Sequence, residues 1–384
     1  PLYRTHTVYH PITYPPFARF NRVGVNYFQQ AIPTFIFKDN TAAHRIQKLK
    51  VDMKKNSEMA VIVVLIVVFS FVLLGIMLGK YISRTQPLET VNVSCANTMA
   101  EVIESSKGDV YNMEDDPNYI EPTSYYLVKY SVDGDEIENP VFDQIPADLA
   151  DEQKDKALQL EAWHIFANLI PAKDRQMVIQ YNIFTDGTEN TLAAVDQIAA
   201  DPSQWVIEVD IADLENKDAL LFTLIHEYAH LLTLNASQVS VDEEIYNDPF
   251  NTSLIESKTA TCPHYFTGTG CSLPNSYINA FYLRFWEEIN PEWEKIDTLQ
   301  YADDLMPYYN GLYNFYLAHP DQFLDDYSTT HPAEDIAESF TYFVLSPKPK
   351  ENSIKDKKIL FFYEYTELVE LRQSILESTC APNK

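Results

Sequence analysis

Two histidines and a glutamate stand inside the apolar stretch LLFTLIHEYAHLLTL, residues 220–234. Because His226 and His230 are four residues apart, a helix would place both imidazoles on one face. A helix that is apolar all round is buried, and burying these groups together with Glu227 is costly unless partners compensate them. Two imidazoles at this spacing are ligands for Zn²⁺. The sequence therefore predicts a zinc site on a buried helix over residues 217–234.

Glu227 adds a group that hydrolysis would use. A carboxylate beside the metal can hold a water and accept its proton as the water attacks a carbonyl, while the metal lowers the pKa of that water. Glu227 is therefore the predicted general base. The alternative is a chance match to the five-residue pattern, in which His226 and His230 are ordinary core histidines.

A catalytic zinc site needs a third protein ligand, and the segment HPAEDIAESF, residues 331–340, holds the best candidate. On a helix that begins near Pro332, Glu334 and Glu338 share a face. We expect Glu334 to bind the metal and Glu338 to hold the second nitrogen of a ligand histidine. The alternative third ligands are Glu243, Glu244 and Glu256.

The HEYAH pattern and the later Glu-Asp-x-Ala-Glu helix together resemble gluzincin metallopeptidases of the zincin class. The closest likeness is to the anthrax lethal factor-like group and to bacterial zinc-binding metallopeptidases. The resemblance implies Zn²⁺ as the cofactor, held by His226, His230 and Glu334. In the lethal factor-like group a tyrosine before the ligand glutamate stabilises the oxyanion, which gives that role to Tyr327 here. His331, just before the ligand helix, is the alternative donor.

The resemblance also implies how a substrate binds. In zincins the strand before the metal helix is an edge strand that pairs with an extended peptide, and QWVIEVDIA, residues 204–212, stands in that place. A peptide or protein is therefore the expected substrate. The alternative interpretation of this segment is an ordinary core strand.

The elements around these motifs predict an α+β fold. Helical spacing over 149–170 is followed by three strand-like segments and the metal helix, and the remainder is mainly helical. We expect a zincin-like metallopeptidase domain at 149–384, with a small sheet that has an edge strand, a metal-binding helix and a mostly helical C-terminal half. The expected strands are 176–185, 189–200 and 204–212, and the expected later helices are 275–290, 303–318, 320–327, 331–346 and 354–378.

Residues 59–79 contain no charged side chain and are long enough to cross a bilayer as a helix. Lysines concentrate before this segment, which predicts an uncleaved signal anchor with a cytoplasmic N-terminus and an extracellular domain. The expectation is a single-pass membrane protein at the cell surface. Residues 1–58 are interpreted as a cytoplasmic tail or an over-extended gene start, and residues 80–148 as an acidic stalk.

The formal net charge of −28 argues against nucleic acid or an anionic membrane surface as a ligand, and favours basic or neutral substrates. Four cysteines are present. In an oxidising compartment an even number favours disulfides, here Cys262 with Cys271 and Cys95 with Cys380. Four free thiols are the alternative.

These observations predict a membrane-anchored zinc metalloendopeptidase of the gluzincin type. One alternative is a catalytically silent zinc-binding or scaffold domain at the cell surface, although such a site would have no need of Glu227. A peptidase-like fold without a metal is the other.

Overall fold

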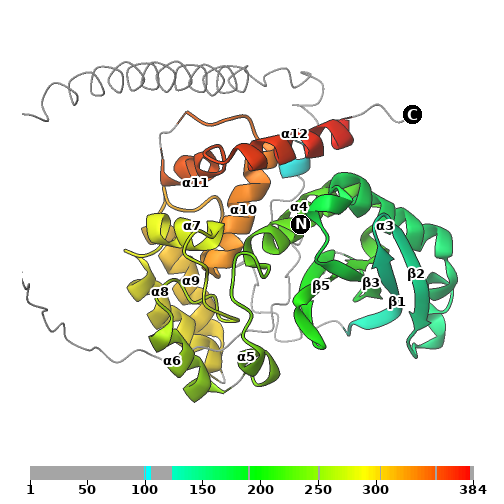
Figure 1. The fold of residues 1–384 in the computed structure, drawn as a ribbon, viewed down its shortest axis with the longest axis horizontal. Helices are drawn as coiled ribbons and strands as arrows, with labels where there is room; N and C mark the ends of the chain where they lie inside the picture. Colours follow the sequence, from blue (N-terminus) through cyan, green and yellow to red (C-terminus); the bar gives the residue numbers. More distant parts are fainter. Residues whose placement is uncertain are drawn as a thin grey trace, which may run out of the picture. The chain divides into compact units, whose positions relative to one another are not determined.

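The computed structural model describes residues 99, 101–104, 123–188, 191–249, 251–302, 304–350 and 353–380. The fold given below is that of these residues, which all belong to one of the two units of the chain. Figure 1 shows it as a twisted sheet with helices along one side and a larger group of helices next to the sheet.

A mixed five-stranded sheet forms the first half, with the strand order β2-β1-β3-β5-β4. Strands β3 and β5 are parallel, and every other neighbouring pair is antiparallel. Strand β5 is therefore an inner strand, and β4 forms the edge nearest to it. The strands are β1 (Tyr125–Asp133), β2 (Glu136–Phe142), β3 (Val178–Thr185), β4 (Ala193–Ile198) and β5 (Asp201–Asp210).

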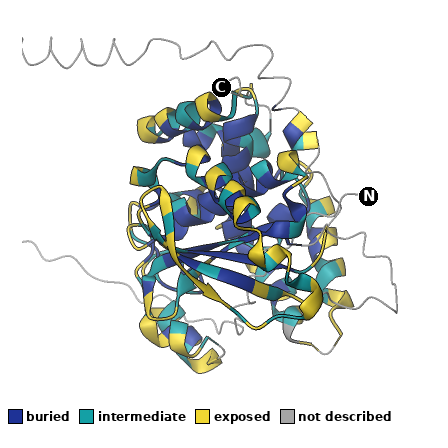
Figure 2. Cartoon of the chain, turned by 90° about the vertical axis from the view of Figure 1, so that its right-hand side faces the viewer, coloured by how far each residue is buried: buried dark blue, intermediate teal, exposed yellow. Residues whose placement is uncertain are grey.

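The two faces of the sheet differ because successive side chains point to opposite sides of a strand. Tyr181 pairs with Ile207 on one face, and both side chains are buried. Helix α3 (Lys156–Leu169) covers this face, with the ring of Trp163 5.2 Å from that of Tyr181. The opposite face is mixed: Asn182 donates a hydrogen bond of 2.6 Å to Glu208, and the side chains of Val206 and Phe184 are buried. Figure 2 shows the buried positions running from the strands into the helices.

Helix α10 (Pro332–Leu345) is the centre of the helical half. It packs against α4 (Lys217–Leu234), where Tyr228 and Phe340 have ring centroids 6.3 Å apart. It also contacts α7, α11 and α12, so nearly all of its residues are buried. The other helices are α5 (Glu243–Asn247), α6 (Thr252–Thr261), α7 (Tyr277–Phe285), α8 (Asn290–Asp297), α9 (Met306–Ala318), α11 (Ile354–Phe362) and α12 (Thr366–Cys380).

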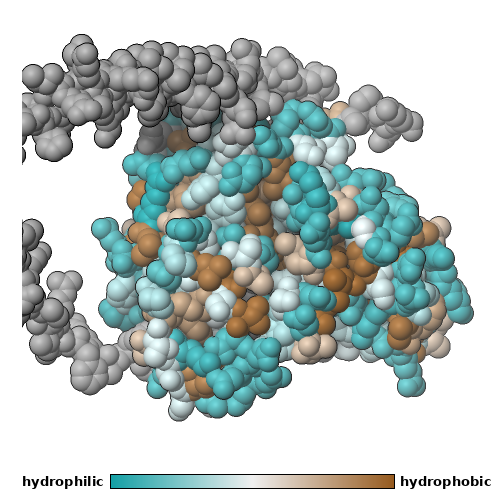
Figure 3. All heavy atoms as spheres, in the orientation of Figure 1, coloured by the Kyte–Doolittle hydropathy of each residue, from teal (hydrophilic) through white to brown (hydrophobic). Residues whose placement is uncertain are grey.

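The outer surface mixes polar and apolar side chains. On the face shown in Figure 3, hydrophilic groups lie between smaller hydrophobic ones. Large exposed apolar side chains include Val141 and Phe142 on strand β2, and Leu317 on α9. An intermixed surface of this kind agrees with a self-contained folded unit.

The prediction of a transmembrane helix is not borne out by the structure. No helix in the described ranges is long and apolar enough to cross a bilayer, and residues 59–79 lie outside those ranges. The structure therefore does not support the transmembrane helix that was part of the expected fold class. It also does not support the expected location as a single-pass membrane protein with an extracellular domain. The interpretations of residues 1–58 and of Cys95 also lie outside the described residues.

Four further expectations differ from the structure. Strands β1 and β2 occupy residues 125–142, which were assigned to the stalk, so the sheet begins well before residue 149. The segment 204–212 is not an edge strand, because β4 pairs along the outer side of β5. The C-terminal helix expected at 354–378 is divided into α11 and α12, and within 320–327 the structure has only the start of a short 3₁₀ turn, Tyr327–Thr329.

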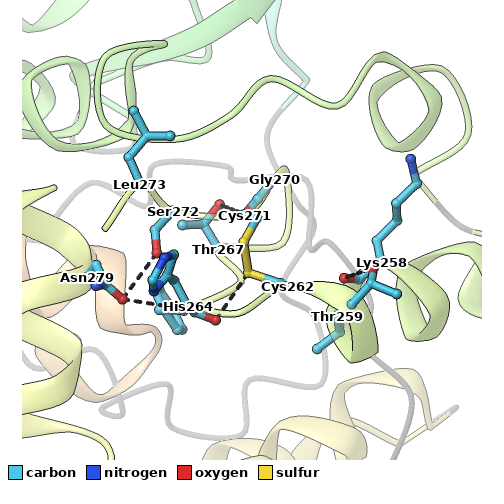
Figure 4. The surroundings of a disulfide bond; sticks show 12 residues. Lys258, Thr259, Cys262, His264, Thr267, Gly270, Cys271, Ser272, Leu273 and Asn279 are labelled. Carbon is cyan, nitrogen blue, oxygen red and sulfur yellow. Dashed lines mark hydrogen bonds between the residues drawn. A yellow bond between two sulfur atoms is a disulfide. The ribbon is translucent and has the colours of Figure 1, made fainter. Parts of the chain in front are cut away.

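A disulfide joins Cys262 to Cys271 across a short loop after α6, as predicted (Figure 4). Cys380 is also disulfide-bonded. Residue 270 must be glycine, because a Cβ there would lie 2.1 Å from the carbonyl oxygen of Ser240. The loop therefore runs close against the chain that follows α4.

Candidate metal centre

Helix α4 carries the two histidines. It begins at the N-cap Asn216, whose side chain accepts a hydrogen bond from the Ala219 N–H, and it continues to Leu234 because no glycine or proline interrupts it. The residues of the HEYAH motif are all buried. The sequence interpretation of this segment as a buried helix is confirmed.

Helix α10 carries the acidic motif. It begins at His331, whose Nδ1 accepts a hydrogen bond of 3.0 Å from the Ala333 N–H, with Pro332 at the first helical position. Both Glu334 and Glu338 are buried on this helix. Acidic side chains in the first turn also suit the positive end of the helix dipole.

Three side-chain atoms from these two helices converge. His226 Nε2 lies 3.0 Å from Glu334 Oε2 and 3.0 Å from His230 Nε2, and His230 Nε2 lies 3.3 Å from Glu334 Oε2. Within the described residues this is the one group of three or more His, Cys, Asp or Glu side chains with the spacing for a metal ion. The group can therefore hold a metal.

The donor set fits a first-row divalent ion. Ligand atoms about 2.0–2.1 Å from a tetrahedral zinc ion are about 3.3 Å from one another, close to the observed separations. Two imidazole nitrogens and one carboxylate oxygen also make a common catalytic ligand set, with a fourth position for water or substrate. Metal coordination would compensate the burial of all three groups.

Glu338 lies behind the first imidazole. Its Oε1 is 2.9 Å from His226 Nδ1. This contact favours the tautomer that carries its proton on Nδ1, which leaves the Nε2 lone pair directed at the metal position. The structure thus places Glu338 where the sequence predicted it.

The pKa values within the metal group depend on the carboxylates of Glu334 and Glu338. Burial lowers the pKa of His226, but hydrogen bonds and charges from Glu334 and Glu338 outweigh this and raise the pKa to about 10. Burial raises the pKa of Glu334, but the two histidines have the larger effect and hold it well below its usual value. Without a metal, the group therefore holds a proton on His226 beside an ionised Glu334.

The remaining predicted residues lie around this group. Glu227 is fully buried next to His226 on α4. Tyr327 is buried with its ring centroid 5.8 Å from that of His226. Burial lowers the pKa of His331 to about 4, with opposing charge effects from Glu334 and His230. A neutral His331 whose Nδ1 accepts a hydrogen bond carries its proton on Nε2.

The alternative third ligands lie elsewhere. Glu243 and Glu256 are exposed on α5 and α6, and Glu244 forms an ion pair of 2.7 Å with Lys258. Neither helix contributes to the metal group. Glu334 is therefore the third member that the structure brings to the histidines.

One feature next to this group could not be predicted from the sequence. Asp335, the neighbour of Glu334, forms a fully buried ion pair with Lys358 of α11. Its sequence signal is weak: Lys358 precedes the apolar run ILFF, and a lysine in that position is usually exposed. Only the tertiary packing reveals the pair.

Comparison with known proteins adds no further evidence. No family model, curated protein or solved structure matches the chain. The chemistry assigned to this site therefore depends on its own residues and on the resemblance of its motifs.

Proposed function

We propose that the protein is a zinc-dependent endopeptidase of the gluzincin type. The observation that carries the proposal is the convergence of His226, His230 and Glu334, from two separate helices, beside the buried carboxylate of Glu227. A purely structural metal site has no use for that carboxylate. The ligand set of two histidines and one glutamate is typical of catalytic zinc.

Each residue has a distinct role in this proposal. Zinc, when bound, supplies Lewis-acid chemistry, because it lowers the pKa of water and polarises a carbonyl. Glu227 accepts the proton of the attacking water and passes it to the leaving amine. Tyr327 or His331 donates a hydrogen bond to the oxyanion that develops on the substrate. Glu338 orients His226.

The proposed substrate is an extended polypeptide. Strand β4 forms the edge of the sheet and contacts α4, so it replaces β5 as the strand beside which a peptide would lie. At its C-terminal end, the Gln197 carbonyl already accepts a hydrogen bond of 3.0 Å from the Tyr246 hydroxyl. The net charge of −28 favours basic or neutral peptides.

The substitution Glu227→Gln tests this function. Its amide cannot accept a proton, so hydrolysis of a degenerate peptide library or a denatured protein should fall by roughly two to four orders of magnitude. Zinc content should stay unchanged, because Glu227 is not a ligand. Glu161→Gln, on the exposed surface of α3, is the matched control and should retain full activity.

Two results would contradict the proposal. Activity that survives Glu227→Gln would place the chemistry outside the HEYAH motif. A wild-type chain that binds zinc but cleaves nothing, with Glu227→Gln indistinguishable from it, would favour the catalytically silent zinc-binding domain.

A further inference from the structure

A buried ion pair adjoins the metal group. Lys358 Nζ of α11 lies 2.5 Å from Asp335 Oδ2 of α10, and both side chains are fully buried. The same carboxylate oxygen accepts a hydrogen bond of 2.7 Å from Trp286 Nε1, at the end of α7. Three helices of the helical half thus meet at one carboxylate.

Three aromatic rings also lie near the ammonium group, and the carboxylate of Asp325 interacts with it electrostatically. Lys358 Nζ lies 4.3 Å from the ring centroid of Phe323, 5.9 Å from that of Phe281 and 6.0 Å from that of Trp286. Removing a lysine and an aspartate from water is costly, and apolar replacements of similar volume often leave stability unchanged or increase it. Stability alone is therefore a poor explanation for this pair.

The position of Asp335 suggests another explanation. Asp335 and Glu334 are consecutive residues in the first turn of α10, and successive helical side chains point about 100° apart. Glu334 is directed at the histidines of α4, whereas Asp335 is directed at α7 and α11. Any rotation of this turn would move both carboxylates together.

We propose that Asp335, Lys358 and Trp286 are positioning residues for the metal ligand Glu334. By holding one side of the first turn of α10, they fix its rotation and place Glu334 Oε2 within 3.3 Å of both histidine nitrogens. The proposal rests on the metal site of the proposed function. It concerns the affinity and geometry of that site and adds no group that touches a substrate.

The double variant Asp335→Asn, Lys358→Met tests it in the full-length chain. Both charges are removed, the side-chain sizes are nearly kept, and the new amide oxygen can still accept the Trp286 N–H. The folded state should persist, while zinc affinity, measured by competition with a chelator, should fall about 10- to 100-fold, as for other residues that orient metal ligands. The visible absorption spectrum of the Co²⁺-loaded protein should change, because the ligand geometry is altered.

Arg372→Met is the matched control. Arg372 is a cation of α12 that donates hydrogen bonds to the carbonyl oxygens of Phe343 and Ser346, at the opposite end of α10. This variant should lower the midpoint of urea unfolding but leave zinc affinity and the Co²⁺ spectrum unchanged. An equal loss of zinc affinity in Arg372→Met would show that any weakening of α10 disturbs the site, and would overturn the positioning role.

Trp286→Phe keeps the ion pair and removes the hydrogen bond to Asp335 together with part of a fully buried ring, so it provides the test if the double variant does not fold. Its zinc affinity should fall severalfold. Wild-type affinity in a folded double variant, or in Trp286→Phe if the double variant is unfolded, would refute the positioning role while leaving the proposed function intact. A wild-type chain that binds no zinc would refute both.

Discussion

His226 is the residue on which the candidate site depends most. Its Nε2 contacts both other members of the metal group, and its Nδ1 contacts Glu338. The sequence predicted all four of these residues, because helical spacing at four residues and a buried apolar setting restrict what the side chains can do. It could not predict the ion pair of Asp335, since no pattern in the sequence marks Lys358 as a buried lysine.

Zinc binding should release a proton from His226. The pKa of His226 is raised to about 10 in the metal-free protein, so the imidazole is protonated near neutral pH, whereas an imidazole that binds a metal must be neutral. We expect about one proton released per zinc, and an affinity for zinc that rises with pH up to about pH 10. Calorimetry in two buffers with different ionisation enthalpies measures this number. Equal binding enthalpies in the two buffers would show that His226 is already neutral.

At the scale of elements, α4 and α10 were predictable and the sheet was only partly so. Both helices carry long, uninterrupted apolar patterns, and their observed bounds lie within one residue of the expected ones. Strand β5 was recognised as a strand, but periodicity says nothing about its neighbours, and β4 takes the edge. The division between α11 and α12 carries no glycine or proline signal. Pairing and helix breaks depend on distant contacts.

The short turn Tyr327–Thr329 precedes α10 and contacts it, so it supplies the candidate oxyanion donor. Tyr327→Phe should retain zinc. It should lose about 3 kcal/mol of transition-state stabilisation, which lowers the rate of peptide hydrolysis on the order of a hundredfold. Tyr313→Phe, at an exposed position on α9, is the control and should have no effect. Full activity in Tyr327→Phe would assign the donor role to His331.

At the scale of the whole molecule, the disulfide belongs to a part of the fold separate from the metal site. Ile245, Ile255 and Phe266 form a small hydrophobic cluster beside Cys262 and Cys271, distinct from the main core. Asn279 connects the loop to α7, because its Oδ1 accepts hydrogen bonds from the Tyr265 N–H and the Ser272 hydroxyl (Figure 4). The loop therefore stabilises this cluster and contributes no metal ligand.

Replacing both cysteines by serine, Cys262→Ser and Cys271→Ser, should separate stability from metal binding. For a loop with a sequence separation of 9, the unfolding free energy should fall by about 2–3 kcal/mol in urea denaturation. Zinc content should stay at the wild-type value, because α4 and α10 hold all three ligands. Loss of zinc in a folded double-serine variant would show that the loop supports the site directly.

Elemental analysis of the purified full-length chain tests the central claim most directly. We predict about one zinc per chain in the wild type and less than about a tenth of that in Glu334→Ala, since a site left with two imidazoles lacks its third protein ligand. Glu256→Ala, which changes an exposed glutamate on α6, should bind zinc as the wild type does. A wild-type chain without stoichiometric metal, or full zinc occupancy in Glu334→Ala, would contradict the assignment of His226, His230 and Glu334 as the metal site.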